Sequence, residues 1–114
     1  MNDNISVLLV DDHAMLRKGM ALLLDEEADI DVIGEAGDGG QAIAQARALQ
    51  PDVVVMDINM PGVNGIEATR QIVSEFPDIK IIALSIHSGK RFVDDMLSAG
   101  AAGYLLNPSL SPYI

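Results

Sequence analysis

Apolar and polar residues alternate along this chain in two recurring patterns, which predict strands and helices in turn. The run ISVLLV at residues 5–10 is continuously apolar, as is typical of a strand buried on both faces of a sheet. The next segment, residues 13–26, spaces its leucines and methionines as an amphipathic helix does. The same patterns predict further strands at residues 31–36, 52–57, 79–85 and 102–106, and further helices at residues 41–49, 66–76 and 89–99.

The alternation of strand and helix favours an α/β fold with a parallel sheet and helices on both of its faces. An open sheet of this kind normally covers its last strand with a helix. Residues 109–114, SLSPYI, offer serines that suit a helix cap and a proline that suits a first turn, so we interpret them as the start of an incomplete fifth helix. One face of the strands at 5–10 and 102–106 would then be uncovered, which predicts homodimers, exchange of elements between chains or low stability.

Polar side chains stand where the predicted strands end, and ligands of open parallel sheets bind outside the carboxyl ends of the strands. Asp11 and Asp12 follow the first strand, and Asp57 ends the third. Ser85 ends the fourth strand and Asn107 follows the fifth. One aspartate after a strand is commonly a turn or helix cap, but three at the same edge favour a site.

Composition narrows the chemistry that such a site can support. The chain has no cysteine and two histidines, which argues against disulfides and zinc sites and suits a cytoplasmic protein. Clustered carboxylates repel one another unless a cation joins them, and oxygen ligands favour Mg²⁺. Mg²⁺ held by carboxylates typically awaits phosphate oxygens, and a carboxylate beside it can act as a nucleophile and form an aspartyl phosphate.

Charge and local motifs exclude other classes of function. Seventeen acidic residues against seven basic ones give a net charge of −10, so we expect no direct binding of nucleic acid. No apolar run approaches the roughly 20 residues of a membrane span. The stretch GDGG at residues 37–40 lacks the Gly-Lys-Ser/Thr of a phosphate loop, so we interpret it as a turn in which Asp38 caps the next helix.

Four motifs in order carry a resemblance to a known family: LLVDDH, VVVMDINMPGVNG, IIALS and GYLL followed by Asn-Pro. In these motifs the chain resembles the receiver domain of two-component response regulators, most closely those with a helix-turn-helix output domain of the LuxR/NarL type. The resemblance spans residues 5–108 and implies one receiver domain at residues 1–114, with the DNA-binding output domain absent from this chain. It also implies a doubly wound, flavodoxin-like sheet of five parallel strands in the order 2-1-3-4-5.

The resemblance implies a role for each strand-end residue. Asp57 matches the aspartate that accepts a phosphoryl group from a sensor histidine kinase. Asp11 and Asp12 match the acidic pair that organises Mg²⁺, joined by Asp57 and the backbone carbonyl of Asn59. Ser85 matches the hydroxyl that hydrogen-bonds the phosphoryl group.

Further positions match the switching apparatus of the family. Tyr104 matches the aromatic residue whose rotamer follows the serine hydroxyl, and Asn59 and His87 match two positions that tune hydrolysis of the phosphoryl group. His87 is equally consistent with a plain exposed loop residue. Such a domain accepts and hydrolyses its own aspartyl phosphate, is not a conventional enzyme, and switches an output domain, usually transcriptional, in the parent protein.

The chain departs from the family pattern at Asn107, where a lysine is expected. Asn107 can donate a hydrogen bond but carries no charge to offset a phosphoryl group. An alternative therefore stays open: a degenerate receiver that acts as a phosphorylation-independent interaction module. A haloacid-dehalogenase-like phosphatase also uses an aspartate and Mg²⁺, but that family has Asp-x-Asp after its first strand, whereas Asp11 and Asp12 are adjacent.

Overall fold

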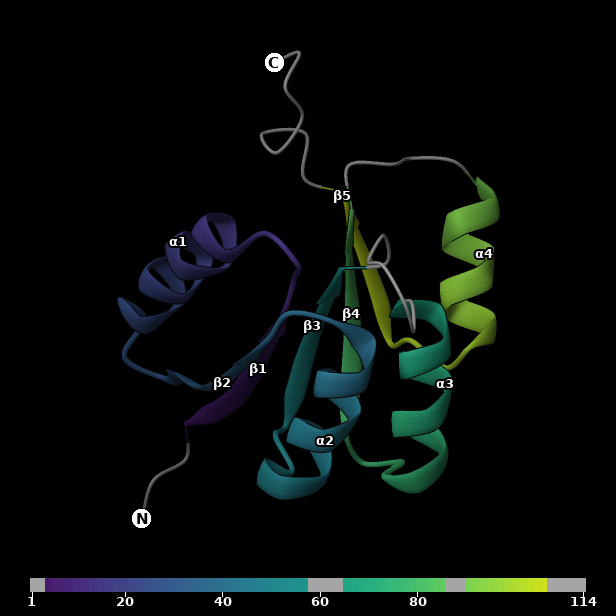
Figure 1. Ribbon diagram of the computed structural model, residues 1–114, viewed down its shortest axis with the longest axis horizontal. Coiled ribbons are helices and arrows are strands. Elements are labelled where there is room, and N and C mark those ends of the chain that lie inside the picture. The colour runs from purple at the N-terminus through teal and green to yellow at the C-terminus, as the bar shows by residue number, and fades with distance from the viewer. Residues whose placement is uncertain (1–3, 58–64, 86–89, 107–114) are drawn as a thin grey trace.

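The computed structural model describes residues 4–57, 65–85 and 90–106, and shows one parallel sheet with helices on both faces (Figure 1). The strand order is β2-β1-β3-β4-β5, which confirms the predicted doubly wound fold. The strands are β1 (Ile5–Val10), β2 (Ile30–Ala36), β3 (Val53–Asp57), β4 (Lys80–Ser85) and β5 (Gly103–Leu106), and the helices are α1 (Ala14–Asp25), α2 (Gly39–Leu49), α3 (Gly65–Glu75) and α4 (Lys90–Ser98). Residues 107–114, where a fifth helix was predicted to begin, lie outside the described residues.

The two faces of the sheet are covered unequally. Helices α2, α3 and α4 pack side by side on one face, whereas α1 packs on the other face along β1 and β2 (Figure 1). Because successive side chains of a strand point to opposite faces, Leu8 and Val10 enter the main core, while Val7 and Leu9 face α1. On the α1 face the neighbouring Val55 is only half-buried, and α1 has no buried residue.

The main core lies between the sheet and the three helices α2, α3 and α4. It is built from aliphatic side chains of the central strands and small residues of the helices, which let the helices approach the sheet closely. Its buried members include Leu8, Val10, Val54, Met56, Ile81 and Ala83 from the strands and Ala42, Ala46, Ala68, Ile72 and Met96 from the helices. This core holds the carboxyl ends of β1, β3 and β4 in place.

The expectation that one face of the first strand would be exposed is wrong. Residues Val7 to Val10 are at most 4% exposed, because α1 packs over β1 on the side that α2 does not cover. Among the described residues, the three most exposed large apolar side chains are on α1, where Met15 is 90% exposed, Leu22 70% and Leu23 66%. Homodimers or exchange of elements through the strand at 102–106 remain predictions.

Both ends of helix α2 follow recognisable capping rules. The carboxylate of Asp38 accepts a hydrogen bond of 2.8 Å from the backbone N–H of Gln41, as the predicted cap requires. Because this cap lies inside GDGG, α2 begins at Gly39, two residues earlier than the pattern of apolar residues predicts. At its other end, Gln50 takes a left-handed conformation with φ of 46° immediately before Pro51.

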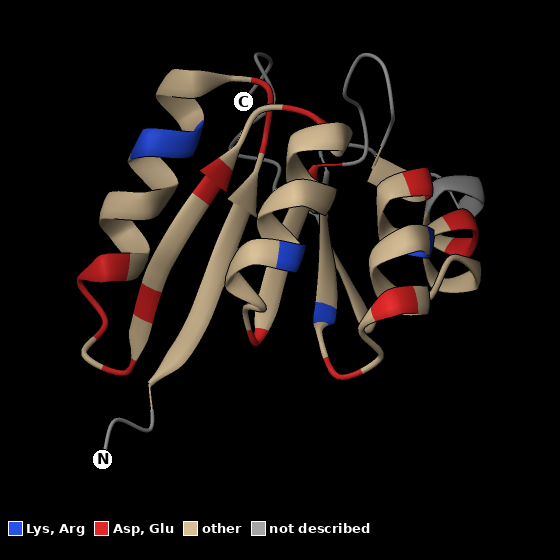
Figure 2. Cartoon of the chain, turned by 60° about the horizontal axis from the view of Figure 1, so that its bottom comes forward, with Lys and Arg blue, Asp and Glu red and all other residues tan. Residues whose placement is uncertain are grey.

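Charged residues are distributed unevenly over these elements. Figure 2 shows acidic residues in loops at both ends of the sheet, with the basic residues mostly on helices. Among the described residues, no helix is long and apolar enough to cross a membrane.

Gly100 provides a test of how α4 is joined to β5. Its φ is 111°, and a Cβ placed on it would lie 2.9 Å from Cγ1 of Val73 on α3. We expect Gly100→Ala to lower the free energy of unfolding by roughly 1–3 kcal/mol, because it combines backbone strain with a steric clash. Urea denaturation measures the change.

Gly19 is the matched control for this substitution. It lies inside α1, and a Cβ added there would meet no atom within 4 Å. Gly19→Ala should stabilise the chain by about 0.5–1 kcal/mol, because alanine loses less backbone entropy in a helix. Equal effects of the two substitutions would contradict the account of Gly100.

Candidate functional site

Three carboxylates converge at the carboxyl edge of the sheet. Strands β1 and β3 are parallel neighbours in which Val10 pairs with Met56, so the next residues, Asp11 and Asp57, lie side by side at the carboxyl ends of the two strands. Asp12 and His13 lie on the loop to α1, and one ligand atom from each of the four residues lies within 4.8 Å of the others. The structure therefore brings the three strand-end aspartates into one cluster.

Asp11 is the most firmly held member of the cluster. Only 5% of this residue is exposed, and its backbone N–H donates a 3.0 Å hydrogen bond to the carbonyl of Ala36 at the end of β2. Its carboxylate Oδ1 accepts a 2.8 Å hydrogen bond from the backbone N–H of His13. Asp12 is more exposed, so one carboxylate is fixed by the fold while the other reaches toward solvent.

His13 is a member of the cluster that the sequence analysis missed. Its Nδ1 lies 3.1 Å from Oδ1 of Asp11 and 3.1 Å from Oδ1 of Asp12. The hydrogen bond to Asp11 raises the pKa of His13 above its ordinary value, and the charges of Asp12 and Asp11 act in the same direction. A histidine directly after the aspartate pair was the available signal, because the start of a helix brings its side chain back toward the preceding turn.

The raised pKa of His13 can be measured directly. In the metal-free chain, NMR titration should give His13 a pKa above 6.5, and Asp12→Asn should lower it. Because the folded-state pKa is raised, this contact stabilises the fold fully below a pH of about 6.5, and the stabilisation is lost as the pH rises through the folded-state pKa. A pKa for His13 at or below the ordinary value would contradict the geometry.

Of the other predicted residues that the structure describes, Ser85 lies at the same edge of the sheet, whereas Tyr104 lies near the start of β5. Asp57 pairs with Leu84, so the backbone of Ser85 is one residue further along the adjacent strand. Tyr104 pairs with Ala83 and packs, half-buried, against the main core. Three further predicted positions, Asn59, His87 and Asn107, lie outside the described residues. The roles of all these residues stay predictions.

Arg17 and Glu35 are two more residues near the cluster that the sequence analysis missed. Arg17, in the first half of α1, donates from Nη1 to the backbone carbonyl of Asp11 and from Nε to Oε1 of Glu35, the latter over 3.0 Å. Glu35 is the penultimate residue of β2. The sequence analysis considered polar residues at the ends of the first, third, fourth and fifth strands. Glu35 could have been found by considering the end of the second strand as well.

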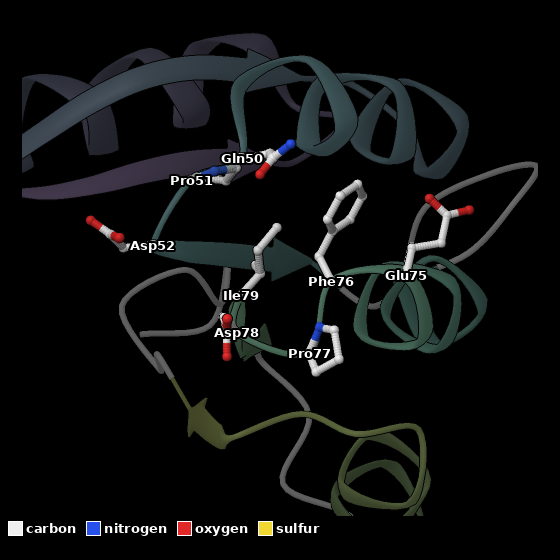
Figure 3. A pocket seen from close by; sticks show the side chains of 8 residues that line it. All are labelled: Gln50, Pro51, Asp52, Glu75, Phe76, Pro77, Asp78 and Ile79. Atoms are coloured by element: carbon white, nitrogen blue, oxygen red, sulfur yellow. The ribbon is translucent and has the colours of Figure 1, made fainter.

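A separate hollow of about 310 Å³ lies at the opposite edge of the sheet (Figure 3). It is formed where the turns before β3 and β4 meet, and it is lined by Gln50, Pro51, Asp52, Glu75, Phe76, Pro77, Asp78 and Ile79. Asp52 and Asp78 lie at the amino ends of β3 and β4, so neither can join the cluster at the carboxyl ends. The hollow is therefore unrelated to the acidic site.

A doubly wound parallel sheet with an acidic cluster at the carboxyl edge defines the class of this protein as a flavodoxin-like α/β domain. The family model of the response regulator receiver domain matches residues 7–112, almost the whole chain. The chain belongs to the response regulator receiver domain family.

Individual relatives agree with this assignment. The transcriptional regulatory protein LiaR of Bacillus subtilis (strain 168) is 48% identical over 110 residues, which cover 92% of this chain and 50% of LiaR. A two-component response regulator of the LuxR family from Aurantimonas sp. SI85-9A1 superposes with a TM-score of 0.85 at 39% identity, covering 89% of this chain and 72% of that one. CheY from Borrelia burgdorferi, in a complex with CheX, BeF3 and Mg²⁺, superposes with a TM-score of 0.85 at 27% identity, covering 91% of this chain and 78% of that one.

The chain spans about half the length of the curated relatives it matches. The similarity therefore concerns the receiver part of these regulators, several of which are transcriptional regulators by name.

Proposed function

We propose that this receiver domain accepts a phosphoryl group on Asp57 from a sensor histidine kinase, with Mg²⁺ bound at the acidic cluster. The observation that carries the proposal is the convergence of Asp11, Asp12 and Asp57, whose ligand atoms lie within 4.8 Å of one another together with that of His13. Carboxylates this close repel one another, so the cluster favours binding of a cation.

The donor set fits Mg²⁺. Ligand oxygens around an octahedral Mg²⁺ are about 2.9 Å apart when adjacent and about 4.1 Å apart when opposite, because each Mg–O bond is about 2.05 Å. No two ligand atoms of the cluster are more than 4.8 Å apart, which supports assigning Asp11, Asp12 and Asp57 to one ion. We assign the backbone carbonyl of Asn59 as a further ligand from the family motif alone.

The chemistry assigned to Asp57 is a displacement at phosphorus. One carboxylate oxygen of Asp57 forms a bond to the phosphorus as the phosphorus–nitrogen bond of the donor phosphohistidine breaks, and the bond electrons return to the donor imidazole. Bound Mg²⁺ would neutralise the phosphoryl oxygens during this transfer. Asp11 and Asp12 supply the negative charge that holds the ion, and the hydroxyl of Ser85 is assigned to hydrogen-bond the phosphoryl group.

The relatives support this assignment and suggest its output. The Borrelia CheY structure contains BeF3 and Mg²⁺, and its fold matches that of this chain. Several relatives are transcriptional regulators of about twice the length of this chain, so we propose an output domain as the partner in the parent protein. Tyr104, at the edge of the core, is the residue through which a change at Ser85 would be passed on.

Asn107 is the specific reason to keep a second candidate function. The family pattern places a lysine at this position, and an amide cannot supply its positive charge. Loss of a charged or hydrogen-bonding stabiliser of a transition state typically costs roughly 3 kcal/mol, about 10²-fold in rate. Receiver function without phosphorylation, through binding to a protein partner, is the alternative that Asn107 favours.

Incubation with acetyl phosphate and Mg²⁺ tests the proposed chemistry. We expect a single base-labile phosphoryl adduct by intact mass spectrometry, lost in Asp57→Asn and on removal of Mg²⁺. Asp78→Asn is the matched control, because this exposed carboxylate lies at the opposite edge of the sheet and should leave the adduct unchanged. An adduct that persists in Asp57→Asn would refute Asp57 as the acceptor.

Asn107→Lys separates the two candidate functions. If the chain is a phospho-accepting receiver slowed by the missing cation, Asn107→Lys should raise the rate of adduct formation by about 10²-fold. Asn107→Gln controls for side-chain length without adding charge and should have little effect. No adduct on either the unchanged chain or Asn107→Lys, with Mg²⁺ bound, would overturn phosphorylation of Asp57 and favour the phosphorylation-independent alternative.

A further inference from the structure

Arg17 connects three separate parts of the fold next to the acidic cluster. It belongs to α1, its Nε donates a 3.0 Å hydrogen bond to Glu35 of β2, and its Nη1 donates to the backbone carbonyl of Asp11 at the end of β1. The side chain of Arg17 is 16% exposed and that of Glu35 is 23% exposed, so solvent screens this pair less than a surface ion pair. A planar guanidinium can satisfy both acceptors at once, because its donors form a rigid fork.

The hydrogen bond from Arg17 to Asp11 helps to fix the backbone that carries the acidic cluster. The amide N–H of Asp11 is held by the carbonyl of Ala36 and its carboxylate by the N–H of His13. Arg17 holds the remaining polar group of this residue, its carbonyl oxygen. Because the peptide bond that contains this carbonyl is planar, fixing the oxygen also fixes the N–H and the Cα of Asp12.

Glu35 holds the guanidinium in place. Partial burial by itself raises the pKa of Glu35, but hydrogen bonds from Lys18 and Arg17, together with their charges, outweigh burial and lower the pKa below its ordinary value. Glu35 is therefore ionised at neutral pH and keeps Arg17 directed toward the end of β1. Lys18 contacts the other oxygen of Glu35 over 3.1 Å, but its side chain is 69% exposed and it forms no hydrogen bond with Asp11.

We propose that Arg17, oriented by Glu35, is a positioning residue for the metal-binding aspartates Asp11 and Asp12. This inference rests on the proposed function, since it assigns Arg17 a role in the affinity of that same site for Mg²⁺. Arg17 does not touch the ion. It sets the direction in which the loop after β1 presents its carboxylates.

Isothermal titration of the chain with Mg²⁺ tests the proposal. Removing a group that orients metal ligands typically weakens binding by 10–100-fold, so Arg17→Met should raise the Mg²⁺ dissociation constant about 10-fold. The dissociation constant of Arg17→Lys should lie between those of the unchanged chain and Arg17→Met. An ammonium keeps the positive charge but lacks the planar set of donors that reaches both acceptors. Lys18→Met, which removes only the exposed partner of Glu35, should leave the dissociation constant within about 2-fold.

A second control and a double variant distinguish positioning from general stability. Arg47→Met removes another guanidinium–carboxylate pair, whose Nε–Oε2 and Nη2–Oε1 distances to Glu75 are 2.8 and 2.6 Å, on the elements α2 and α3. The Mg²⁺ affinity of Arg47→Met should equal that of the unchanged chain, because this pair does not contact the acidic cluster. Glu35→Gln should weaken Mg²⁺ binding when Arg17 is present and should add nothing in the Arg17→Met background, because both act through one contact.

The outcomes separate this inference from the proposed function. Failure of the unchanged chain to bind Mg²⁺ would overturn both. Two other outcomes would overturn the positioning role alone. The first is normal Mg²⁺ binding by the unchanged chain with unaltered Mg²⁺ affinity in Arg17→Met. The second is that the effects of Arg17→Met and Glu35→Gln on this affinity are additive. If thermal melts show that Arg17→Met does not fold, Glu35→Gln alone decides, and an unaltered affinity in that folded variant would also overturn the role.

Discussion

The parallel pairing of β1 with β3 is the constraint on which the site depends. A shift of this register by one residue would turn every apolar side chain of β1 toward the wrong face, so the buried residues Leu8, Val10, Val54 and Met56 hold it firmly. The same register sets Asp11 beside Asp57. The energy of the hydrophobic core therefore maintains an arrangement of like charges that electrostatics alone would disperse.

Contacts within the chain hold the aspartates of the acidic cluster to different degrees. Hydrogen bonds from the backbone of His13 and the guanidinium of Arg17 hold Asp11 from within the chain. The carboxylate of Asp12 reaches toward solvent from the loop after β1, where its Oδ1 lies 3.1 Å from Nδ1 of His13. The fold therefore fixes Asp11 more firmly than Asp12, an arrangement that suits the cation binding proposed above.

The fold and the acidic cluster could be predicted from the sequence because both depend on local patterns. An apolar run such as that of β1 indicates a central strand wherever it occurs, and parallel strands place the residues after them at one edge. The contact between Arg17 and Glu35 joins residues 18 positions apart, and no periodicity reports which side chains meet at that range. The error over exposure of the first strand has the same origin, since burial depends on where α1 packs rather than on the composition of β1.

The absence of buried residues from α1 has a consequence for how the molecule moves. Regions with few buried apolar contacts open locally at a smaller free-energy cost than the core, so hydrogen exchange should be faster in α1 than in β1 or β3. The aspartate pair lies at the boundary between these two regions. Under the proposed function, a cation held by Asp12 would bind best while α1 is docked, so occupancy of the site and local unfolding of α1 would be thermodynamically linked.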